Sequence, residues 1–148
     1  MGERLPIHHL NPRKPKLELP PGSWDTHFHV LGPKAAFAFA STTTIDPADA
    51  TKDMLFALHA KLGIERGVFV QSAVHGMDNR VVEDALAAKG GSYLGIALLP
   101  PDVGNDELRR LDALGFRGVR YNFMKHLHQS ASLDDVMALT ARLADIGW

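Results

Sequence analysis

The sequence from Ile64 to Leu99, IERGVFVQSAVHGMDNRVVEDALAAKGGSYLGIALL, decides the fold. Its first eight residues are rich in β-branched side chains, its middle has an amphipathic pattern that ends at Gly90 and Gly91, and Tyr93–Leu99 is apolar on both faces. Two apolar strands separated by one helix form a βαβ unit, in which the strands lie parallel and the crossover is right-handed. This stretch therefore predicts a parallel sheet covered by helices.

The same alternation continues on both sides of this unit. Trp24–Val30 is the expected first strand, and Pro47–Leu62, with Asp46 as its cap, is the expected first helix. Phe116–Phe123 is the expected fourth strand, and Ser132 opens a last helix with a capping box in which aspartate replaces the usual glutamate. The chain is therefore predicted to form four consecutive strand–helix units of the α/β class, with strands buried on both faces.

The turn after the first strand separates two α/β architectures. A doubly wound dinucleotide fold needs a glycine-rich phosphate loop there, and the sequence has none. A long loop, Leu31–Asp46, follows instead, as is typical of active-site loops at the carboxyl ends of barrel strands. The favoured fold is the (β/α)8 TIM-barrel type. A complete barrel takes about 250 residues, so these 148 residues are expected to supply about the first four βα units.

Composition excludes several classes of partner. Lysine and arginine number 16 and aspartate and glutamate number 17, so the net charge of −1 argues against nucleic-acid binding. No apolar stretch approaches the roughly 18 residues of a membrane span, so no membrane partner is expected. Because the chain has no cysteine, any metal must be held by imidazole and carboxylate groups.

Residues 1–22 are expected to form an extended proline-rich arm ahead of a half-barrel at 23–148. The arm contains prolines among arginine and lysine residues, which favours an extended chain. His8 and His9 within it are expected to be solvated. Because Met1–Leu10 lacks the apolar core of a secretory signal, the cytoplasm is the expected compartment.

Polar side chains are concentrated at the end of the first strand. Because strand side chains alternate between two faces, Asp25, His27 and His29 are expected to share the face that points to the barrel axis. Burying imidazoles without partners costs free energy, so two of them at a strand end favour a functional role over that of satisfied core histidines. His27 and His29 are therefore the candidate catalytic residues.

The fourth strand adds a cation and an amide. In FRGVRYNF, alternation puts Arg120 and Asn122 on one face, towards the two imidazoles. A guanidinium can grip a carboxylate through two hydrogen bonds, so Arg120 is a candidate substrate-binding residue, with an ion pair to Asp25 or Asp102 as the structural alternative. Asn122 is a second candidate for substrate binding.

Further polar residues follow the second and fourth strands. Gln71 and His75 come after the second strand, where they either contact substrate or brace the loop. His126 and His128 come just after the fourth strand, where a substrate contact competes with simple solvation. His59 lies within the first helix and is expected to be a surface or packing residue.

Three stretches of the chain carry a resemblance to a known family. They are DTHFHVLGP at 25–33, VQSAVHGMDN at 70–79 and GFRGVRYNF at 115–123. The first resembles the His-X-His signature of the amidohydrolase superfamily of barrel hydrolases. In this order and at this spacing, all three resemble its 2-pyrone-4,6-dicarboxylate lactonase branch. The resemblance covers nearly everything after Pro20 and implies a lactone-opening hydrolase of aromatic compound catabolism.

The resemblance also implies a role for each matched position. His27 and His29 correspond to imidazoles that help to polarise the lactone carbonyl, and Arg120 corresponds to the guanidinium that holds a substrate carboxylate. The general base of the relatives is an aspartate at the end of the eighth strand, helped by a histidine from the sixth, so the base is expected beyond this chain. Asp25 lies two residues before His27 and is expected to orient the imidazoles.

The sequence departs from the lactonase pattern at three positions. His126 stands where the relatives have a second substrate-gripping arginine, Ala73 replaces a serine, and Ile45 replaces a substrate-contacting tyrosine. Each lost charge-assisted hydrogen bond is worth roughly 1.5–3 kcal/mol, so a different lactone or cyclic carboxylate ester is expected as substrate. His126 and His75 are kept as candidate substrate-binding residues.

The sequence leaves two views of metal dependence. His27 and His29 would suit one divalent metal ion such as zinc, which would need further ligands and would activate water. The guanidinium of Arg120 beside them would oppose a dication, so a mechanism that requires no metal is favoured.

Three hypotheses for function follow. The preferred one is a hydrolase that opens a small-molecule lactone or related cyclic carboxylate by attack of an activated water. A metal-dependent decarboxylase of the same superfamily is the first alternative. The second is a non-catalytic truncated half-barrel whose sheet edges are closed by self-association into a homo-oligomer.

Overall fold

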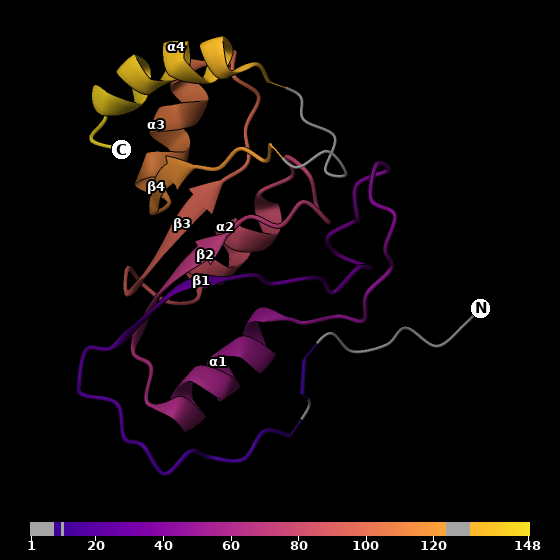
Figure 1. Cartoon of the computed structure of the whole chain (residues 1–148), viewed down its shortest axis with the longest axis vertical. Coiled ribbons are helices and arrows are strands. Elements are labelled where there is room, and N and C mark those ends of the chain that lie inside the picture. Colours follow the sequence, from indigo (N-terminus) through magenta and orange to yellow (C-terminus); the bar gives the residue numbers. More distant parts are fainter. Residues whose placement is uncertain (1–7, 10, 124–130) are drawn as a thin grey trace.

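A four-stranded parallel sheet forms the centre of the molecule. In the computed structural model, which describes residues 8–9, 11–123 and 131–148, the strand order equals the chain order. The strands are β1 (Trp24–Phe28), β2 (Arg66–Val70), β3 (Tyr93–Ala97) and β4 (Phe116–Val119). Each is followed by a helix (Figure 1), in turn α1 (Lys52–Leu62), α2 (Arg80–Ala87), α3 (Asn105–Ala113) and α4 (Leu133–Ala144). The four predicted strand–helix units are confirmed.

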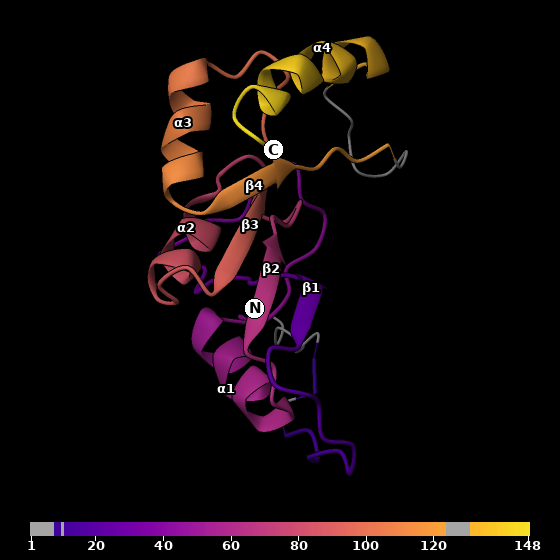
Figure 2. The ribbon, with the colours of Figure 1, turned by 90° about the vertical axis from the view of Figure 1, so that its left-hand side faces the viewer.

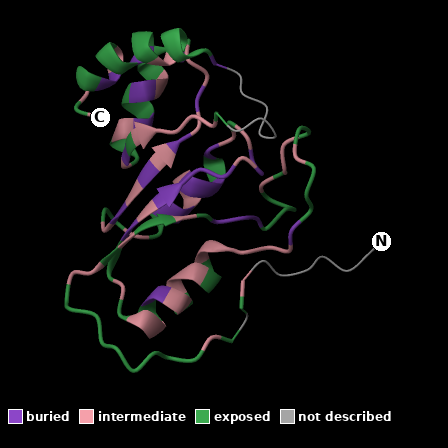
Figure 3. Cartoon of the chain, in the orientation of Figure 1, coloured by how far each residue is buried: buried purple, intermediate pink, exposed green. Residues whose placement is uncertain are grey.

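The core lies between the sheet and its helices. Figure 2 shows α1, α2 and α3 on the same side of the sheet, and the buried residues gather in this layer (Figure 3). The largest of these side chains are fully buried: Tyr93, Phe69, Phe116, Leu108 and Leu111. Burying an apolar side chain of this size contributes roughly 1.5–3 kcal/mol, so this single layer holds the sheet against the helices.

The other face of the sheet is only partly covered. On β3 the residues alternate between buried and half-buried, and Leu94 and Ile96 are on the half-buried face. On β1, Trp24, Thr26 and His27 are exposed. The prediction that the strands are buried on both faces is therefore wrong for this chain. Side chains on the inner face of a barrel are covered by the strands opposite, and four strands supply only half of that circle.

The loop that follows β1 is longer than predicted, because α1 begins at Lys52 rather than near Pro47. Backbone hydrogen bonds in both directions between Leu31 and Ala50, each 2.8 Å long, hold the loop ends together in an antiparallel bridge. This bridge keeps the backbone extended up to Thr51, whose hydroxyl then caps the helix by accepting from the Met54 amide. The expected cap, Asp46, instead forms a 2.6 Å ion pair with Lys34 across the loop.

The chain ahead of β1 lies along α1. Residues 11–20 contain no helix or strand and are mostly exposed, and Lys61 of α1 donates a hydrogen bond to the Pro12 carbonyl. The Gly22 amide donates to Glu65 at 3.1 Å, which fixes the entry into β1. Among the helices in the described ranges, none is long and apolar enough to cross a membrane.

Candidate active site at the carboxyl ends of the strands

A bulge in β1 decides which side chains reach the open face of the sheet. Asp25 pairs with Gly67 and Phe28 pairs with Phe69, so three steps along β1 match two steps along β2. A bulge of this kind holds one extra residue and puts the residues on either side of it on the same face. Asp25 and Phe28 therefore both face the helices, where the Asp25 Oδ2 lies 3.4 Å from the His59 Nε2.

This arrangement corrects the expectation for Asp25. The sequence pattern predicted that Asp25 shares a face with His27 and His29 and orients their rings, but its carboxylate lies on the helix side with His59. Asp25 still contacts the backbone next to the site, because its Oδ1 accepts from the His27 amide at 3.2 Å. It thus holds the bulge and contacts His59, rather than the rings of His27 and His29.

His27 and His29 lie together on the open face. Their ring centroids are 5.3 Å apart with the rings nearly perpendicular. The Nδ1–H of His29 donates to the Val70 carbonyl at 2.6 Å, because a carbonyl oxygen can only accept. In the neutral ring this hydrogen bond leaves the Nε2 of His29 as an acceptor. Burial lowers the pKa of His29, and the nearby charges of Arg120 and His27 lower it further, against the raising effect of the Val70 carbonyl.

Arg120 follows β4 and is held by residues from two strand ends. Its guanidinium donates to the Gln71 carbonyl at 3.1 Å and to the Asn122 Oδ1 at 2.5 Å. Its charge lowers the pKa of His29, and the predicted meeting of the cation with both imidazoles stays a prediction. Within the described part of the chain, no carboxylate forms an ion pair with Arg120, so neither Asp25 nor Asp102 is its partner. Burial lowers the pKa of Arg120.

His75 braces the first loop. Its Nδ1–H donates to the Ala38 carbonyl at 3.1 Å, its Nε2 accepts from the Gly32 amide at 3.2 Å, and the ring meets Phe39 edge-on. Both ring nitrogens are therefore occupied by residues of the loop, and burial lowers the pKa of the imidazole. Of the two roles that the sequence left open, these contacts support loop bracing, and contact of His75 with a substrate stays a prediction.

Gln71 has a similar bracing role. Its side chain is fully buried, and the Nε2 donates to the carbonyls of Gly76 and Asp78, at 3.0 and 2.8 Å. These bonds shape the turn between β2 and α2. The backbone carbonyl of Gln71, in turn, holds Arg120. The loop after β2 therefore contributes to the site mainly by positioning its neighbours.

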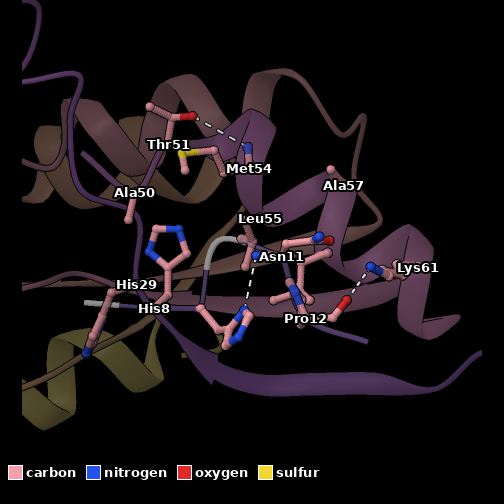
Figure 4. A pocket seen from close by; sticks show the side chains of 12 residues that line it. His8, Asn11, Pro12, His29, Ala50, Thr51, Met54, Leu55, Ala57 and Lys61 are labelled. Atoms are coloured by element: carbon pink, nitrogen blue, oxygen red, sulfur yellow. Dashed lines mark hydrogen bonds between the residues drawn. The ribbon is translucent and has the colours of Figure 1, made fainter. Parts of the chain in front are cut away.

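The remaining histidines divide into three groups. His59 is a packing residue, as expected, since it is fully buried with its Nδ1 2.8 Å from the Tyr93 hydroxyl. His126 and His128 lie outside the described residues. His9 is exposed, as the expectation of solvated histidines requires, and His8 is half-buried; both line a cavity of about 510 Å³ with His29 and one side of α1 (Figure 4). Only the fold brings the arm to this place, so no local signal in the sequence could have indicated it.

The donor set of this half-barrel does not fit a divalent metal ion by itself. Among the described residues no group of three histidine, aspartate or glutamate side chains could hold a metal ion. His27 and His29 supply two imidazoles, Asp25 faces the helices, and the guanidinium of Arg120 lies beside His29. Any further ligands would have to come from outside these ranges.

Comparison with known proteins places this chain in a family. The family model described as amidohydrolase matches residues 24–148. The 2-pyrone-4,6-dicarboxylate hydrolase of Comamonas testosteroni is 41% identical over 140 residues, which cover 95% of this chain and 46% of that protein. The 4-sulfomuconolactone hydrolase of Hydrogenophaga intermedia is 40% identical over 132 residues, which cover 89% of this chain and 43% of that protein.

Solved structures agree on the fold. A protein assigned as a 2-pyrone-4,6-dicarboxylic acid hydrolase of Pseudomonas putida aligns with a TM-score of 0.68 and 30% identity, over 88% of this chain and 47% of its own. A similarly assigned protein of Acinetobacter baumannii has a TM-score of 0.76 at 24% identity, over 86% of this chain and 47% of its own. The chain thus spans about half the length of the relatives it matches, as the prediction of about four βα units requires. The chain belongs to the amidohydrolase family, and its fold matches about half of the barrel of the solved structures.

Proposed function

We propose that this chain binds the substrate in a hydrolase that opens a lactone bearing a carboxylate or a similar anionic group. The observation that carries the proposal is the position of Arg120. Its guanidinium is half-buried beside His29, held by the Gln71 carbonyl and Asn122, and paired with no carboxylate of the described residues. A partly desolvated cation without a counter-ion favours an anionic ligand, which it can bind through two hydrogen bonds.

The two imidazoles fit the reacting end of such a ligand. In lactone hydrolysis, water attacks the carbonyl carbon, negative charge develops on the carbonyl oxygen, and the ring C–O bond then breaks to give a carboxylate and a hydroxyl group. His29 is neutral near pH 7 because its pKa is lowered, so its Nε2 accepts a hydrogen bond and suits the attacking water. His27 lies beside it on the same face and is the imidazole that can donate to the carbonyl oxygen.

The rest of the machinery belongs to the other half of the barrel. The described residues hold no carboxylate on the open face near His27 and His29, since Asp25 is turned towards the helices. The base that takes the proton of the attacking water is therefore expected from outside this chain. A mechanism without a metal ion is favoured, because Arg120 places a positive charge beside the two imidazoles.

The names of the relatives support this class of substrate. One relative is a hydrolase of 2-pyrone-4,6-dicarboxylate and another of 4-sulfomuconolactone, both of which are anionic lactones. The departures at Ala73 and Ile45 favour a lactone that differs from the pyrone dicarboxylate. The cytoplasmic location expected from the sequence stays a prediction.

Binding of 2-pyrone-4,6-dicarboxylate and 4-sulfomuconolactone to this chain, measured by calorimetry, tests the proposal, because the general base is expected from outside the chain. Arg120→Gln should weaken binding by roughly 10- to 100-fold, the equivalent of one charge-assisted hydrogen bond. The matched control is Arg117→Gln, because Arg117 lies in β4, three residues before Arg120, but pairs with Asp112. Equal affinity of the two variants would exclude Arg120 as the anion-binding group, and release of carbon dioxide would instead support the decarboxylase alternative.

A further inference from the structure

Two connecting segments meet at the carboxyl end of β2. They are the first loop, residues 31–50, and the turn between β2 and α2, residues 71–79 (Figure 1). The first loop begins two residues after His29, and the turn begins at Gln71, whose carbonyl holds Arg120. Both segments lie wholly within the described residues, and both adjoin the candidate site.

The ends and the middle of the first loop are held by different contacts. The backbone bridge between Leu31 and Ala50 joins the two ends. In the middle, the Ala40 amide donates to the Val74 carbonyl of the turn at 2.8 Å. Two further hydrogen bonds between the loop and the turn both use the side chain of His75.

The two hydrogen bonds of His75 require a neutral ring. Its Nδ1–H donates to the Ala38 carbonyl at 3.1 Å, because a carbonyl oxygen can only accept. Its Nε2 accepts from the Gly32 amide at 3.2 Å, because an amide N–H can only donate. The ring also meets the Phe39 ring edge-on, with the centroids 5.2 Å apart, and His75 is only 3% exposed. One donor and one acceptor of a single buried imidazole therefore bind the loop.

A second proton on His75 would break this arrangement. In the imidazolium both ring nitrogens carry a proton, so the Nε2–H would point at the Gly32 N–H, one donor against another. The positive charge would also be enclosed with the buried ring, which costs free energy. Both costs are relieved when the loop separates from the turn.

Charged groups of the turn oppose this effect only in part. Burial lowers the pKa of His75 more strongly than any other cause, while the Ala38 carbonyl and the Asp78 carboxylate raise it. The Asp78 carboxylate is itself held by Arg80 through two hydrogen bonds of 2.8 and 2.5 Å. The pKa of His75 therefore stays lowered.

Charged groups of the first loop are paired with one another. The Asp49 carboxylate lies beside Gly32 and accepts from the Lys34 amide at 3.2 Å. The Lys34 ammonium pairs with Asp46 at 2.6 Å and lies 4.8 Å from the centroid of the Phe39 ring. The loop thus brings charges of both signs near His75. Of these groups, the imidazole is the one whose ordinary pKa lies between 5 and 8.

We propose that His75 is a pH-sensitive latch, which holds the first loop against the turn while its imidazole is neutral and releases the loop when the imidazole is protonated. The bridge between Leu31 and Ala50 keeps the two ends of the loop joined, so the release is local. Because the loop begins two residues after His29, its release opens the side of the candidate site that adjoins β1. The proposal concerns the loop alone and does not depend on lactone chemistry.

The pH dependence of the latch has a definite sign. The imidazole has the ordinary pKa of 6.5 in the released loop and a lower pKa in the latched loop. The latched form is therefore fully favoured above pH 6.5, and it is lost as the pH falls through the lowered pKa of His75. For one proton, the closing equilibrium constant falls by at most roughly 25-fold between pH 7 and pH 5.

Amide hydrogen exchange of this chain, read by NMR between pH 7 and pH 5, tests the proposal. Protection factors, which correct for the intrinsic effect of pH on exchange, should fall by about 5- to 25-fold for the Gly32 and Ala40 amides. The Gln71 amide, which donates to the Ile96 carbonyl in the sheet, should keep a higher protection factor at every pH, because the release is local. Equal protection of loop and sheet amides at pH 5 would show that the loop opens only with the whole protein, and it would overturn the latch.

Two histidine variants separate the latch from global stability. His75→Gln offers one donor and one acceptor but does not titrate, so the protection of the loop amides should stay constant from pH 7 to pH 5. His59→Asn is the matched control, because His59 is also buried but contacts Tyr93 in the core. In that control the loop should respond to pH as it does in the unaltered chain. A response that survives in His75→Gln, or that disappears in His59→Asn, would assign the effect to another group.

Nitrogen NMR of the His75 ring in the unaltered chain gives a readout that needs no variant. At pH 7 the ring should carry its proton on Nδ1 alone, and its titration midpoint should lie below 6.5. The fall in loop protection should level off below that midpoint, because both forms of the loop are then protonated. A ring protonated on Nε2 at pH 7, or a titration that leaves the Gly32 and Ala40 amides equally protected throughout, would refute the latch.

Discussion

The Asp25 carboxylate lies 3.4 Å from the His59 imidazole, on the helix side of β1. The carboxylate accepts from the Nε2–H, and the Nδ1 accepts from the Tyr93 hydroxyl at 2.8 Å, so the imidazole is a neutral bridge between strand and core. The same carboxylate accepts from the His27 amide. These contacts run from the buried His59 ring to the exposed His27 amide, and they fix the bulge that turns His27 and His29 to the open face.

Removing the Asp25 carboxylate should therefore destabilise the fold. We expect Asp25→Ala to lower the free energy of unfolding by about 1–3 kcal/mol, because it leaves a buried imidazole N–H without an acceptor. Urea denaturation measures this change. Asp106→Ala is the control, since Asp106 pairs with Arg109 on the surface and such pairs contribute at most about 1 kcal/mol. Equal losses in the two variants would mean that the Asp25–His59 contact adds nothing.

The same histidine makes stability depend on pH. Burial lowers the pKa of both His59 and His75 below 6.5, so the unfolded chain binds protons more readily than the folded one. The stability that the folded protein gains by keeping these two imidazoles neutral is fully present above pH 6.5. It is lost as the pH falls through the pKa values of His59 and His75 in the folded protein. We expect Tm to fall between pH 7 and pH 5, and His59→Asn to flatten that dependence. A Tm that stays constant over this range would contradict the lowered pKa values.

Much of this fold could be predicted from local sequence. The four strand–helix units and the capping box at Ser132, where the Asp135 amide donates to the hydroxyl at 3.1 Å, follow from patterns within a few residues. Arg120 and Asn122, which alternation put on one face, are joined by a hydrogen bond just after the end of β4.

The differences between the predicted and the observed structure all arise from contacts between segments that are distant in sequence. The bulge at Asp25 depends on pairing with β2, and the late start of α1 depends on the bridge from Leu31 to Ala50. The position of His8 beside α1 depends on how the arm packs against that helix. Period and capping signals within one segment contain no information about such pairings, which explains why alternation placed Asp25 on the wrong face.

The charge of Arg120 should be measurable at His29. Arg120→Gln removes a cation that lowers the pKa of His29, so that pKa should rise, and the imidazolium fraction near pH 6 should rise with it. Titration followed by NMR of the His29 ring protons reads this change directly. Arg117→Gln should leave the titration of His29 unaltered, because Arg117 pairs with Asp112. If both variants titrate like the wild type, Arg120 and His29 do not share a site.

Gly32 should be intolerant of a side chain. Its φ of +80° is a left-handed conformation, and a Cβ there would lie 2.7 Å from the Asp49 Oδ1 while the Gly32 amide donates to His75. Gly32→Ala should therefore destabilise the protein by about 1–3 kcal/mol and loosen the first loop. Gly104→Ala is the control, since no atom lies within 4 Å of a Cβ at that position. Thermal unfolding compares the two, and a smaller loss at Gly32 than at Gly104 would contradict this account of the loop.

Zinc binding should be weak and independent of the site histidines. His27 and His29 offer two imidazoles, the bulge turns Asp25 away, and the Arg120 charge beside His29 repels a dication, whereas a zinc site needs at least three protein ligands. Titrations with zinc, measured by calorimetry, should therefore show no one-to-one binding by the wild type. The His27→Ala, His29→Ala variant should give the same heat as the wild type. His8→Ala, His9→Ala is the matched control, because those histidines line the neighbouring cavity. A one-to-one zinc site that disappears only when His27 and His29 are replaced would show that the remaining ligands reach this face, and it would favour metal-dependent chemistry over the proposed mechanism.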